Sequence, residues 1–293
     1  MSASLAVPVW IDTDPAVGEP GADVDDGFAI LQALRSPELE VVGISTVFGN
    51  APGPTGHRIA RHLLALADAP HVPLHAGAHD ARSLGHPSEA SRALTNQLRE
   101  RALRILALGP LTNIATVLLN EPDLAEQIDE IVFVGGRRAG QRFTVAGNGP
   151  LPDFNLECDP AAAAHILDTN VPLTLTGFEV STHATLTAGH LDRLAAGPPA
   201  ARWLAQHSRA WISWWQEHLG VDGFHPFDTL AVAALATPEL LSLERGAAAL
   251  TPISDGGSSE LHAAVGQPGR RQVRYATTAA EPFVEDLIRR LLS

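Results

Sequence analysis

Several aspartates lie close together near the start of the chain. Asp12 and Asp14 form one pair, Asp25 and Asp26 form another, and Asp23 lies just before the second pair. Such a cluster of like charges is costly unless a cation or bound protons compensate it. Oxygen ligands without a histidine or cysteine cluster are typical of Ca²⁺ or Mg²⁺ sites rather than of zinc sites. The second pair would also suit a helix N-terminus, but two acidic pairs bracketing a Pro/Gly-rich turn favour a metal site.

The elements that must position these side chains alternate between short apolar runs and amphipathic stretches. Strands are predicted at residues 7–12, 39–47, 72–75, 103–108, 131–134, 172–176 and 273–276. Helices are predicted at residues 26–35, 58–69, 111–119, 161–169, 200–218 and 281–292. Apolar strands that alternate with helices pair in parallel through right-handed crossovers. The sequence therefore predicts an α/β fold with a mainly parallel, Rossmann-like sheet flanked by helices. We expect a single domain over residues 1–293, with a helical insert around residues 185–230.

Polar residues follow the ends of three predicted strands. The segment 12–14 ends the first strand, Gly49-Asn50 follows the second, and Gly109-Pro110 follows the fourth. In sheets of this kind the ligand binds beyond the carboxyl ends of the strands. We therefore expect a binding site at this edge of the sheet.

The composition excludes several classes of function. The formal net charge of −13 makes a nucleic acid an unfavourable partner. All 20 basic residues are arginine, so lysine-dependent chemistry, such as Schiff-base formation or a P-loop, is excluded. No apolar stretch approaches the roughly 18 residues that a membrane span needs, and the N-terminus lacks a targeting pattern. We expect a cytoplasmic protein that acts without a membrane or a nucleic acid.

The ordered motifs resemble those of the nucleoside hydrolase family, the inosine-uridine preferring ribonucleoside N-glycosidases. Residues 12–15 are Asp-Thr-Asp-Pro and residues 25–27 are Asp-Asp-Gly, which resembles the signature DTDPGxDDA. Further matches follow in the family's order: Gly49-Asn50, the Gly-Pro-Leu-Thr-Asn turn at 109–113, Gly135-Gly136, Asn148, Asp-Phe-Asn at 153–155, Asp-Pro-Ala-Ala at 159–162, and Phe227-Asp228. The resemblance covers nearly the whole chain, and the ordered set is far more specific than any one motif.

The resemblance implies a Ca²⁺ cofactor and a role for each matching residue. The calcium ligands would be the side chains of Asp14, Asp26 and Asp228 and the backbone carbonyl of Leu108. Asp14 would also take a proton from the attacking water. The ribose hydroxyls would be bound by Asp25, Asn50, Asn155 and Asp228, and the 5′-hydroxyl side by Asn148 and Asp153. The family also implies a homodimer or a homotetramer that acts on small ribonucleosides.

The chemistry of N-glycoside cleavage suits these residue types. The reaction passes through an oxocarbenium-like ribose, as O-glycoside hydrolysis does, and surrounding carboxylates stabilise that positive charge. A bound metal lowers the pKa of a water molecule and orients it. The two hydroxyls of ribose offer hard oxygens to Ca²⁺, which would select ribose over deoxyribose.

The sequence departs from the family pattern in three places. Residues 16–24 form an insertion in the signature loop, where the family usually has two residues. Asp153 replaces a longer glutamate, which affects the expected contacts to the 5′-hydroxyl. Phe227 replaces the histidine that protonates the departing base in some relatives.

Two histidines and a tryptophan are candidates for the leaving-group side of the site. His225 and His218 lie shortly before Phe227 and are possible substitutes for the missing histidine, although each also suits a surface or packing role. Trp215, which clusters with two other tryptophans, would stack on a purine. The alternative for this cluster is packing in the core or at an oligomer interface.

Two other functions fit part of the sequence. Asp12 and Asp14 after a first strand also resemble the aspartate nucleophile motif of haloacid dehalogenase-type phosphatases, but those enzymes need a lysine that this chain lacks. A non-catalytic nucleoside- or ribose-binding protein is the second alternative, because the expected histidine is missing. Retention of every proposed metal and ribose residue favours the hydrolase.

Overall fold

The computed structural model describes residues 6–252 and 259–293, which form an α/β fold around one large sheet. Within these residues the strand order is β3-β2-β1-β4-β5-β7-β10-β8-β9-β6. The strands are β1 (Val7–Thr13), β2 (Leu39–Thr46), β3 (Leu74–Ala76), β4 (Leu103–Ala107), β5 (Ile128–Phe133), β6 (Arg137–Arg138), β7 (Leu173–Leu175), β8 (Leu241–Pro252), β9 (Ser259–Val265) and β10 (Gln272–Ala279). Neighbours from β3 to β10 pair in parallel, whereas β8 pairs antiparallel with both β10 and β9. The predicted fold class is confirmed.

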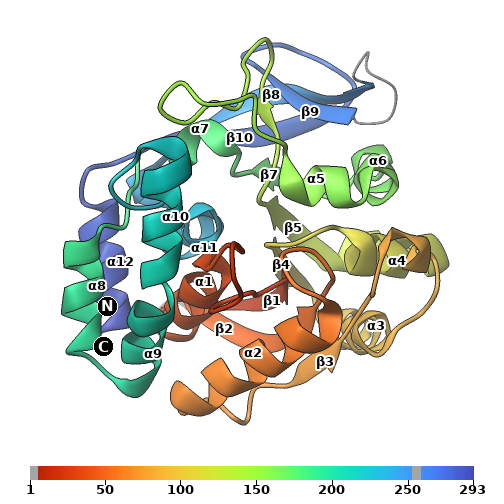
Figure 1. The fold of residues 1–293 in the computed structure, drawn as a ribbon. Coiled ribbons are helices and arrows are strands. Elements are labelled where there is room, and N and C mark those ends of the chain that lie inside the picture. The colour runs from red at the N-terminus through yellow and green to blue at the C-terminus, as the bar shows by residue number, and fades with distance from the viewer. Residues whose placement is uncertain (1–5, 253–258) are drawn as a thin grey trace, which may run out of the picture.

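Helices cover both faces of the sheet (Figure 1). They are α1 (Asp25–Leu34), α2 (Gly53–Leu66), α3 (Glu89–Glu100), α4 (Thr112–Asn120), α5 (Phe154–Cys158), α6 (Pro160–Asp168), α7 (Phe178–Ser181), α8 (Ala188–Ala195), α9 (Pro199–His207), α10 (Arg209–Leu219), α11 (Phe227–Ala236) and α12 (Phe283–Leu291). Three short 3-10 helices are η1 (Ala81–Ser83), η2 (Pro122–Gln127) and η3 (Pro238–Leu240). No helix of the described ranges is long and apolar enough to cross a membrane.

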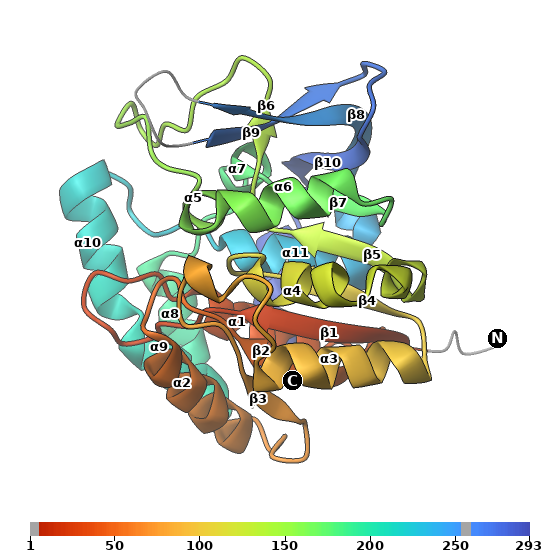
Figure 2. The same ribbon diagram turned by 90° about the vertical axis from the view of Figure 1, so that its right-hand side faces the viewer.

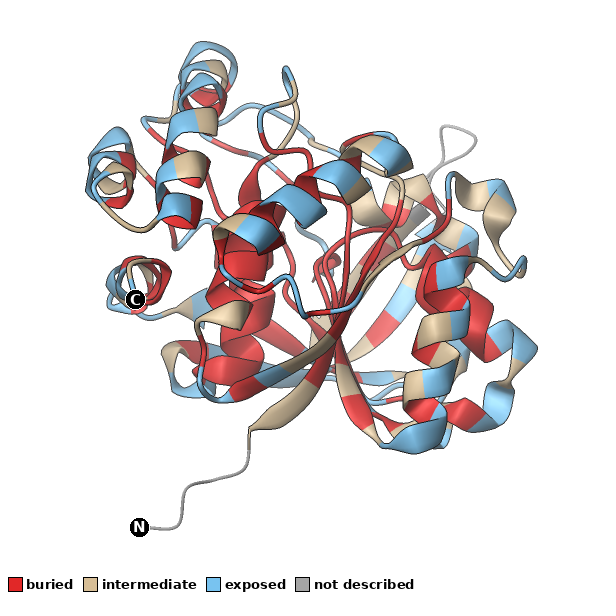
Figure 3. Ribbon diagram, turned by 90° about the horizontal axis from the view of Figure 1, so that it is seen from below, coloured by how far each residue is buried: buried red, intermediate tan, exposed pale blue. Residues whose placement is uncertain are grey.

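Each face of the sheet has its own hydrophobic core. Side chains alternate along β1, so Val9 and Ile11 pack with α1, α11 and α12, while Trp10 packs with α3 and α4 on the other face. Buried residues accordingly run along the strands and the inner sides of the helices, and exposed residues line the outer sides (Figure 3). Burial on both faces explains why the strands are continuously apolar in sequence.

The region of the predicted helical insert contains α8, α9, α10 and the start of α11. The prediction of one helix over residues 200–218 is wrong, because α9 ends at His207 and α10 begins at Arg209. The buried Ser208 lies between them, and its hydroxyl donates a hydrogen bond to the carbonyl of Leu204 at 2.7 Å. A serine that bonds backward in this way often bends a helix.

The antiparallel strands β8 and β9 and the helices α3 and α11 were not predicted from the sequence. Together with β6, β8 and β9 form an extension at one end of the parallel sheet (Figure 2). The α11 helix is buried along almost its whole length, from Asp228 to Ala236. It therefore lacks the alternation of polar and apolar faces that identifies a helix in a sequence.

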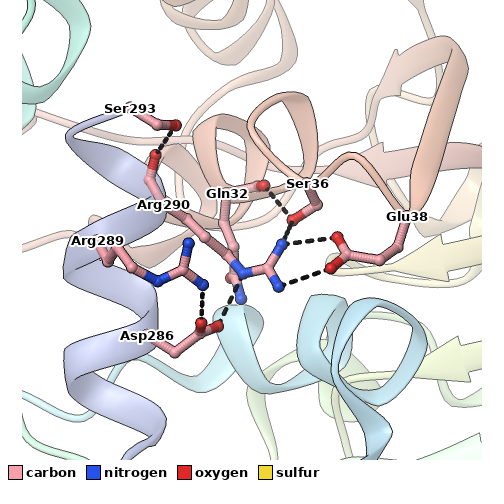
Figure 4. Close-up of polar contacts among 7 residues, drawn as sticks. All are labelled: Gln32, Ser36, Glu38, Asp286, Arg289, Arg290 and Ser293. Carbon is pink, nitrogen blue, oxygen red and sulfur yellow. Dashed lines mark hydrogen bonds and ion pairs between the residues drawn. The ribbon is translucent and has the colours of Figure 1, made fainter.

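The last helix, α12, is tied to the start of β2 by a buried arginine (Figure 4). The guanidinium of Arg290 donates to both carboxylate oxygens of Glu38 at 2.7 and 2.9 Å and to the hydroxyl of Ser36 at 2.9 Å. Its Nε also donates to Asp286 at 2.7 Å. The hydrogen bond from Arg290 lowers the pKa of Glu38. Residues more than 250 positions apart are thereby joined.

We predict that Arg290→Ala lowers the free energy of unfolding by about 2–3 kcal/mol, because it removes charge-assisted hydrogen bonds and leaves Ser36 and Asp286 without that partner. Arg289→Ala is the matched control, since its side chain is 66% exposed and its ion pair is with Asp286 alone. The control should cost less than about 1 kcal/mol. Urea denaturation of both variants measures the difference, and equal losses would contradict the role assigned to Arg290.

Candidate active site

Aspartates from three distant segments converge beyond the carboxyl ends of the strands. Asp14 follows β1, Asp25 and Asp26 begin α1, and Asp228 lies in the first turn of α11. One carboxylate oxygen from each of Asp25, Asp26 and Asp228 lies within 4.8 Å of the others. All four residues are at most 3% exposed. The packing of α1 against α11 thus brings Asp228 to the N-terminal cluster, although about 200 residues separate them.

Backbone amides fix the orientation of these carboxylates. Asp26 Oδ1 accepts from the amide of Asp14 at 3.0 Å and also from the hydroxyl of Thr13. Asp14 Oδ2 accepts from the amide of Asn50 at 2.6 Å, and Asp25 Oδ2 accepts from the amide of Asp228 at 3.0 Å. Hydrogen bonds from backbone amides and from the Thr13 hydroxyl therefore orient the carboxylates without a ligand.

Two oxygens of the cluster have no hydrogen-bond partner. Asp14 Oδ1 and Asp26 Oδ2 are buried and unpaired. A buried carboxylate oxygen normally has a partner, because leaving it unsatisfied costs free energy. Carboxylate oxygens are the preferred ligands of hard divalent cations. The donor set at this site therefore fits such an ion.

The raised pKa values of the clustered aspartates also favour a divalent cation at this site. Burial, reinforced by the neighbouring carboxylates, raises the pKa of Asp14, Asp25 and Asp228 well above the ordinary value of 3.8. Burial and the charge of Asp25 raise the pKa of Asp26 to about 7. Without a cation the cluster holds protons near neutral pH, and a divalent cation would compensate the same charge.

Glycines leave room for the Asp14 side chain. A Cβ atom added to Gly109 would lie 2.7 Å from Asp14 Oδ1, and one added to Gly49 would overlap Asp14 Oδ2. Both glycines follow strand ends, at the turns that the sequence marks as polar. Their role is to let the backbone approach the carboxylate closely.

A buried hydrogen-bond network next to the cluster was not predicted from the sequence as part of the site. Asp12 Oδ1 accepts from Asn113 Nδ2 at 2.8 Å and from the hydroxyl of Ser45, and Asn113 Oδ1 accepts from the amide of Ala78 at 2.8 Å. Burial raises the pKa of Asp12 to about 7. This network joins the ends of β1, β2 and β3 to the start of α4. Asn113 belongs to a motif that the sequence shows, but nothing in the sequence alone pairs it with Asp12.

A cavity of about 330 Å³ opens beside the carboxylates. Its polar lining includes Asp23, Asp25, Asn50, Asp153, Asn155 and Asp228. Its apolar lining includes Leu151, Phe143, Phe178, Phe227, Leu219 and the tryptophans 211, 214 and 215. Such a mixture suits a ligand with one polyhydroxylated part and one flat aromatic part.

Most of the predicted substrate-binding residues line this cavity. They are Asp25, Asn50, Asp153, Asn155 and Asp228, joined by Leu108 and Trp215. Asn155 Nδ2 donates to the carbonyls of Leu108 and Val134 at 2.7 and 3.1 Å. Asp153 Oδ2 accepts from the amide of Gly136 at 2.7 Å, and burial raises the pKa of Asp153 to about 6.

Five predicted site residues lie outside the lining: Asp14 and Asp26, which are buried in the carboxylate cluster, and Asn148, His218 and His225. Asn148 donates through Nδ2 to the carbonyl of Leu219 at 3.1 Å. His218 is exposed and stacks on the ring of Trp214 with centroids 4.6 Å apart. His225 is buried behind the cavity, where its Nδ1 lies 2.7 Å from the carbonyl of Ala184 and burial lowers its pKa.

The tryptophans of α10 form a continuous aromatic wall. Trp211 and Trp214 stack with centroids 4.7 Å apart, and Trp211 meets Trp215 edge to face at 6.3 Å. Trp215 is only 3% exposed, and its ring meets that of His225 at 5.1 Å. The wall therefore packs the insert against the body of the protein and also lines the cavity, which combines the two roles considered for it.

Comparison with known proteins agrees with this geometry. The family model described as "Inosine-uridine preferring nucleoside hydrolase" matches residues 9–281. A non-specific ribonucleoside hydrolase of Klebsiella pneumoniae is 30% identical over 82% of both chains. A uridine nucleosidase of Arabidopsis thaliana is 28% identical over 80% of this chain and 76% of its own.

Solved structures have the same fold. A plant nucleoside hydrolase superposes with a TM-score of 0.84 at 25% identity, covering 98% of this chain and 99% of the other. A purine-preferring ribonucleoside hydrolase from Gardnerella vaginalis superposes with a TM-score of 0.81 at 23% identity, covering 97% and 98%. The likeness extends over the sheet, the helices and the segment that contains the site.

We predict that calcium chloride raises the melting temperature more at about pH 8 than at about pH 5. The raised carboxylate pKa values mean that the metal-free folded state holds protons that the unfolded chain releases. Its stability therefore falls as the pH rises from the ordinary pKa of 3.8 through the folded pKa, which is about 7 for Asp26. A bound cation removes this penalty. Calorimetry with calcium or a chelator measures the effect, and an equal gain at both pH values would contradict it.

Proposed function

Because the chain belongs to the family of inosine-uridine preferring nucleoside hydrolases, and is thus an enzyme of that class, we propose that it cleaves the N-glycosidic bond of ribonucleosides with a Ca²⁺ ion and an aspartate base. The products are ribose and a free nucleobase. The observation that carries the proposal is a buried cluster in which oxygens of Asp25, Asp26 and Asp228 lie within 4.8 Å of one another and the amide of Asp14 bonds to Asp26. Asp14 Oδ1 and Asp26 Oδ2 are unpaired there, beside a cavity that is both polar and aromatic.

Asp14, Asp26, Asp228 and the carbonyl of Leu108 would hold the ion. When bound, Ca²⁺ would lower the pKa of a water molecule and bind the two ribose hydroxyls. Asp14 Oδ1 has no hydrogen-bond partner among the residues that the structure describes and is the atom that would accept the proton of the attacking water. Asp14 Oδ2 remains bound to the amide of Asn50, which keeps the carboxylate in place.

The remaining polar residues would orient the sugar. Asp25 and Asp228 would accept hydrogen bonds from ribose hydroxyls, and Asn50 would bind the same group of hydroxyls. Asn155 donates its amide hydrogens to backbone carbonyls, which leaves Oδ1 to accept from a hydroxyl. Carboxylates around the ring also stabilise the positive charge that develops at C1′ as the bond to the base breaks.

Asp153 and Asn148 would serve the 5′-hydroxyl. Asp153 lines the cavity next to Asn155, whereas Asn148 bonds to the carbonyl of Leu219, itself a lining residue. Asp153 is shorter than the glutamate of the family pattern, and its carboxylate is held by a hydrogen bond from the amide of Gly136. Asn148 would reach the substrate from the edge of the cavity.

The aromatic wall would bind the nucleobase. Trp215 is preferred to His225 and His218 on the leaving-group side, because it alone among the three lines the cavity. Stacking holds a flat base without a charged partner. Relatives are named for uridine and for purine substrates, so a panel of inosine, adenosine, guanosine, uridine and cytidine determines the preference of this enzyme. Release of reducing sugar and free base, followed by chromatography, tests the activity itself.

The alternatives receive less support. A phosphatase of the haloacid dehalogenase type would need a lysine, and the chain has none. A binding protein without activity would not need an unpaired Asp14 oxygen next to the sugar residues. We further propose that the chain acts as one domain in the cytoplasm and assembles as a homodimer or homotetramer, without nucleic acid or membrane partners.

Asp14→Asn should lower kcat by at least about 10³-fold, since it removes the proposed base and weakens a ligand of the ion. The amide oxygen still accepts from Asn50, so the fold should persist, which calorimetry checks. Asp222→Asn is the control, because the substitution removes the same charge. Asp222 is exposed and does not line the cavity. Turnover of Asp14→Asn at the control's rate would refute the assignment.

Ribonucleosides should be hydrolysed far faster than their 2′-deoxy counterparts. Loss of the 2′-hydroxyl removes one of the two oxygens that the ion binds and a donor to the surrounding carboxylates. The comparison of kcat/KM for inosine and 2′-deoxyinosine measures the effect. Equal values would contradict binding of the metal to the sugar diol.

A further inference from the structure

The inserted loop of residues 16–24 is anchored at Val17. This side chain is 3% exposed and lies beside Gly27 of α1 and Leu204 of α9. A Cβ atom on Gly27 would lie 2.6 Å from Val17 Cγ2 and 2.7 Å from Leu204 Cδ2. The glycine after the two aspartates of the signature therefore leaves the space that the insert fills.

The loop ends by placing Asp23 in the cavity. The lining includes both Asp23 and Gly21. Asp23 Oδ1 accepts from the amides of Val24 at 2.7 Å and of Asp25 at 3.4 Å, which satisfies two free N–H groups at the start of α1. Asp23 and Asp25 both line the cavity, and the amide of Asp25 donates to the Asp23 carboxylate. The side chain is thus oriented from the protein side and reaches a residue assigned to the sugar.

We propose that Asp23 is a further substrate-binding residue, which accepts a hydrogen bond from a sugar hydroxyl held next to Asp25. The proposal rests on the function proposed above and specifies one more contact in that site. A carboxylate is an acceptor for O–H donors, and a charge-assisted hydrogen bond is stronger than a neutral one. The insertion therefore adds a contact to ribose, and its placement depends on the packing of Val17 against Gly27.

Asp23→Asn is the decisive variant, because the amide oxygen still accepts from Val24 and Asp25 while the charge is lost. We expect KM for ribonucleosides to rise about tenfold, with kcat changed by less than about twofold. Glu19→Gln is the matched control: it removes one charge from the same loop, but Glu19 does not line the cavity and pairs only loosely with Arg58 at 3.5 Å. Its KM should equal that of the unchanged protein.

Isothermal titration of ribose into the calcium-loaded protein gives a readout that does not need turnover. Asp23→Asn should weaken ribose binding by about the same tenfold factor while calcium affinity stays within about twofold. Ribose affinity and KM equal to those of Glu19→Gln would overturn the proposal. A loss of calcium affinity equal to the loss of ribose affinity would also overturn it, because Asp23 would then act on the ion. If the unchanged protein binds ribose but hydrolyses no ribonucleoside, the proposed activity fails, and the titration still tests Asp23.

Discussion

The mutual repulsion of buried carboxylates is the constraint on which the rest of the site depends. Asp14, Asp25, Asp26 and Asp228 are almost fully buried and close together, so their charges must be balanced by protons or by a cation. The same repulsion that makes the empty cluster hold protons makes it a strong site for a hard divalent ion. It also places negative charge where a cleaving ribose would develop positive charge.

The fold supplies this arrangement through the ends of its strands and helices. Parallel strands bring Asp14 and the turn after β2 to one edge of the sheet, and α11 delivers Asp228 from the far end of the sequence. The network around Asp12 and Asn113 ties these strand ends together. The α10 helix follows α9 directly in the chain, and its tryptophans form the apolar side of the cavity.

Local patterns in the sequence predict the parallel sheet, because buried strands are contiguous, and the family resemblance of the motifs at the strand ends predicts most of the polar lining of the cavity. Contacts between distant segments are not visible in this way: Asp12 and Asn113 are 101 residues apart, and the pairing of β1 with β4, which precedes α4, brings them within hydrogen-bond distance. The strand β8 contains Gly246 and a run of alanines instead of β-branched residues, so its propensity is low. His225 illustrates the limit for the site, since its position in the sequence suits catalysis, whereas its side chain is buried behind Trp215.

A crystal structure of the protein with calcium and ribose tests the central claim most directly. The account predicts one ion with oxygens of Asp14, Asp26 and Asp228 at about 2.3–2.6 Å, and the two ribose hydroxyls completing its shell. A cluster that holds no ion at saturating calcium would contradict the account.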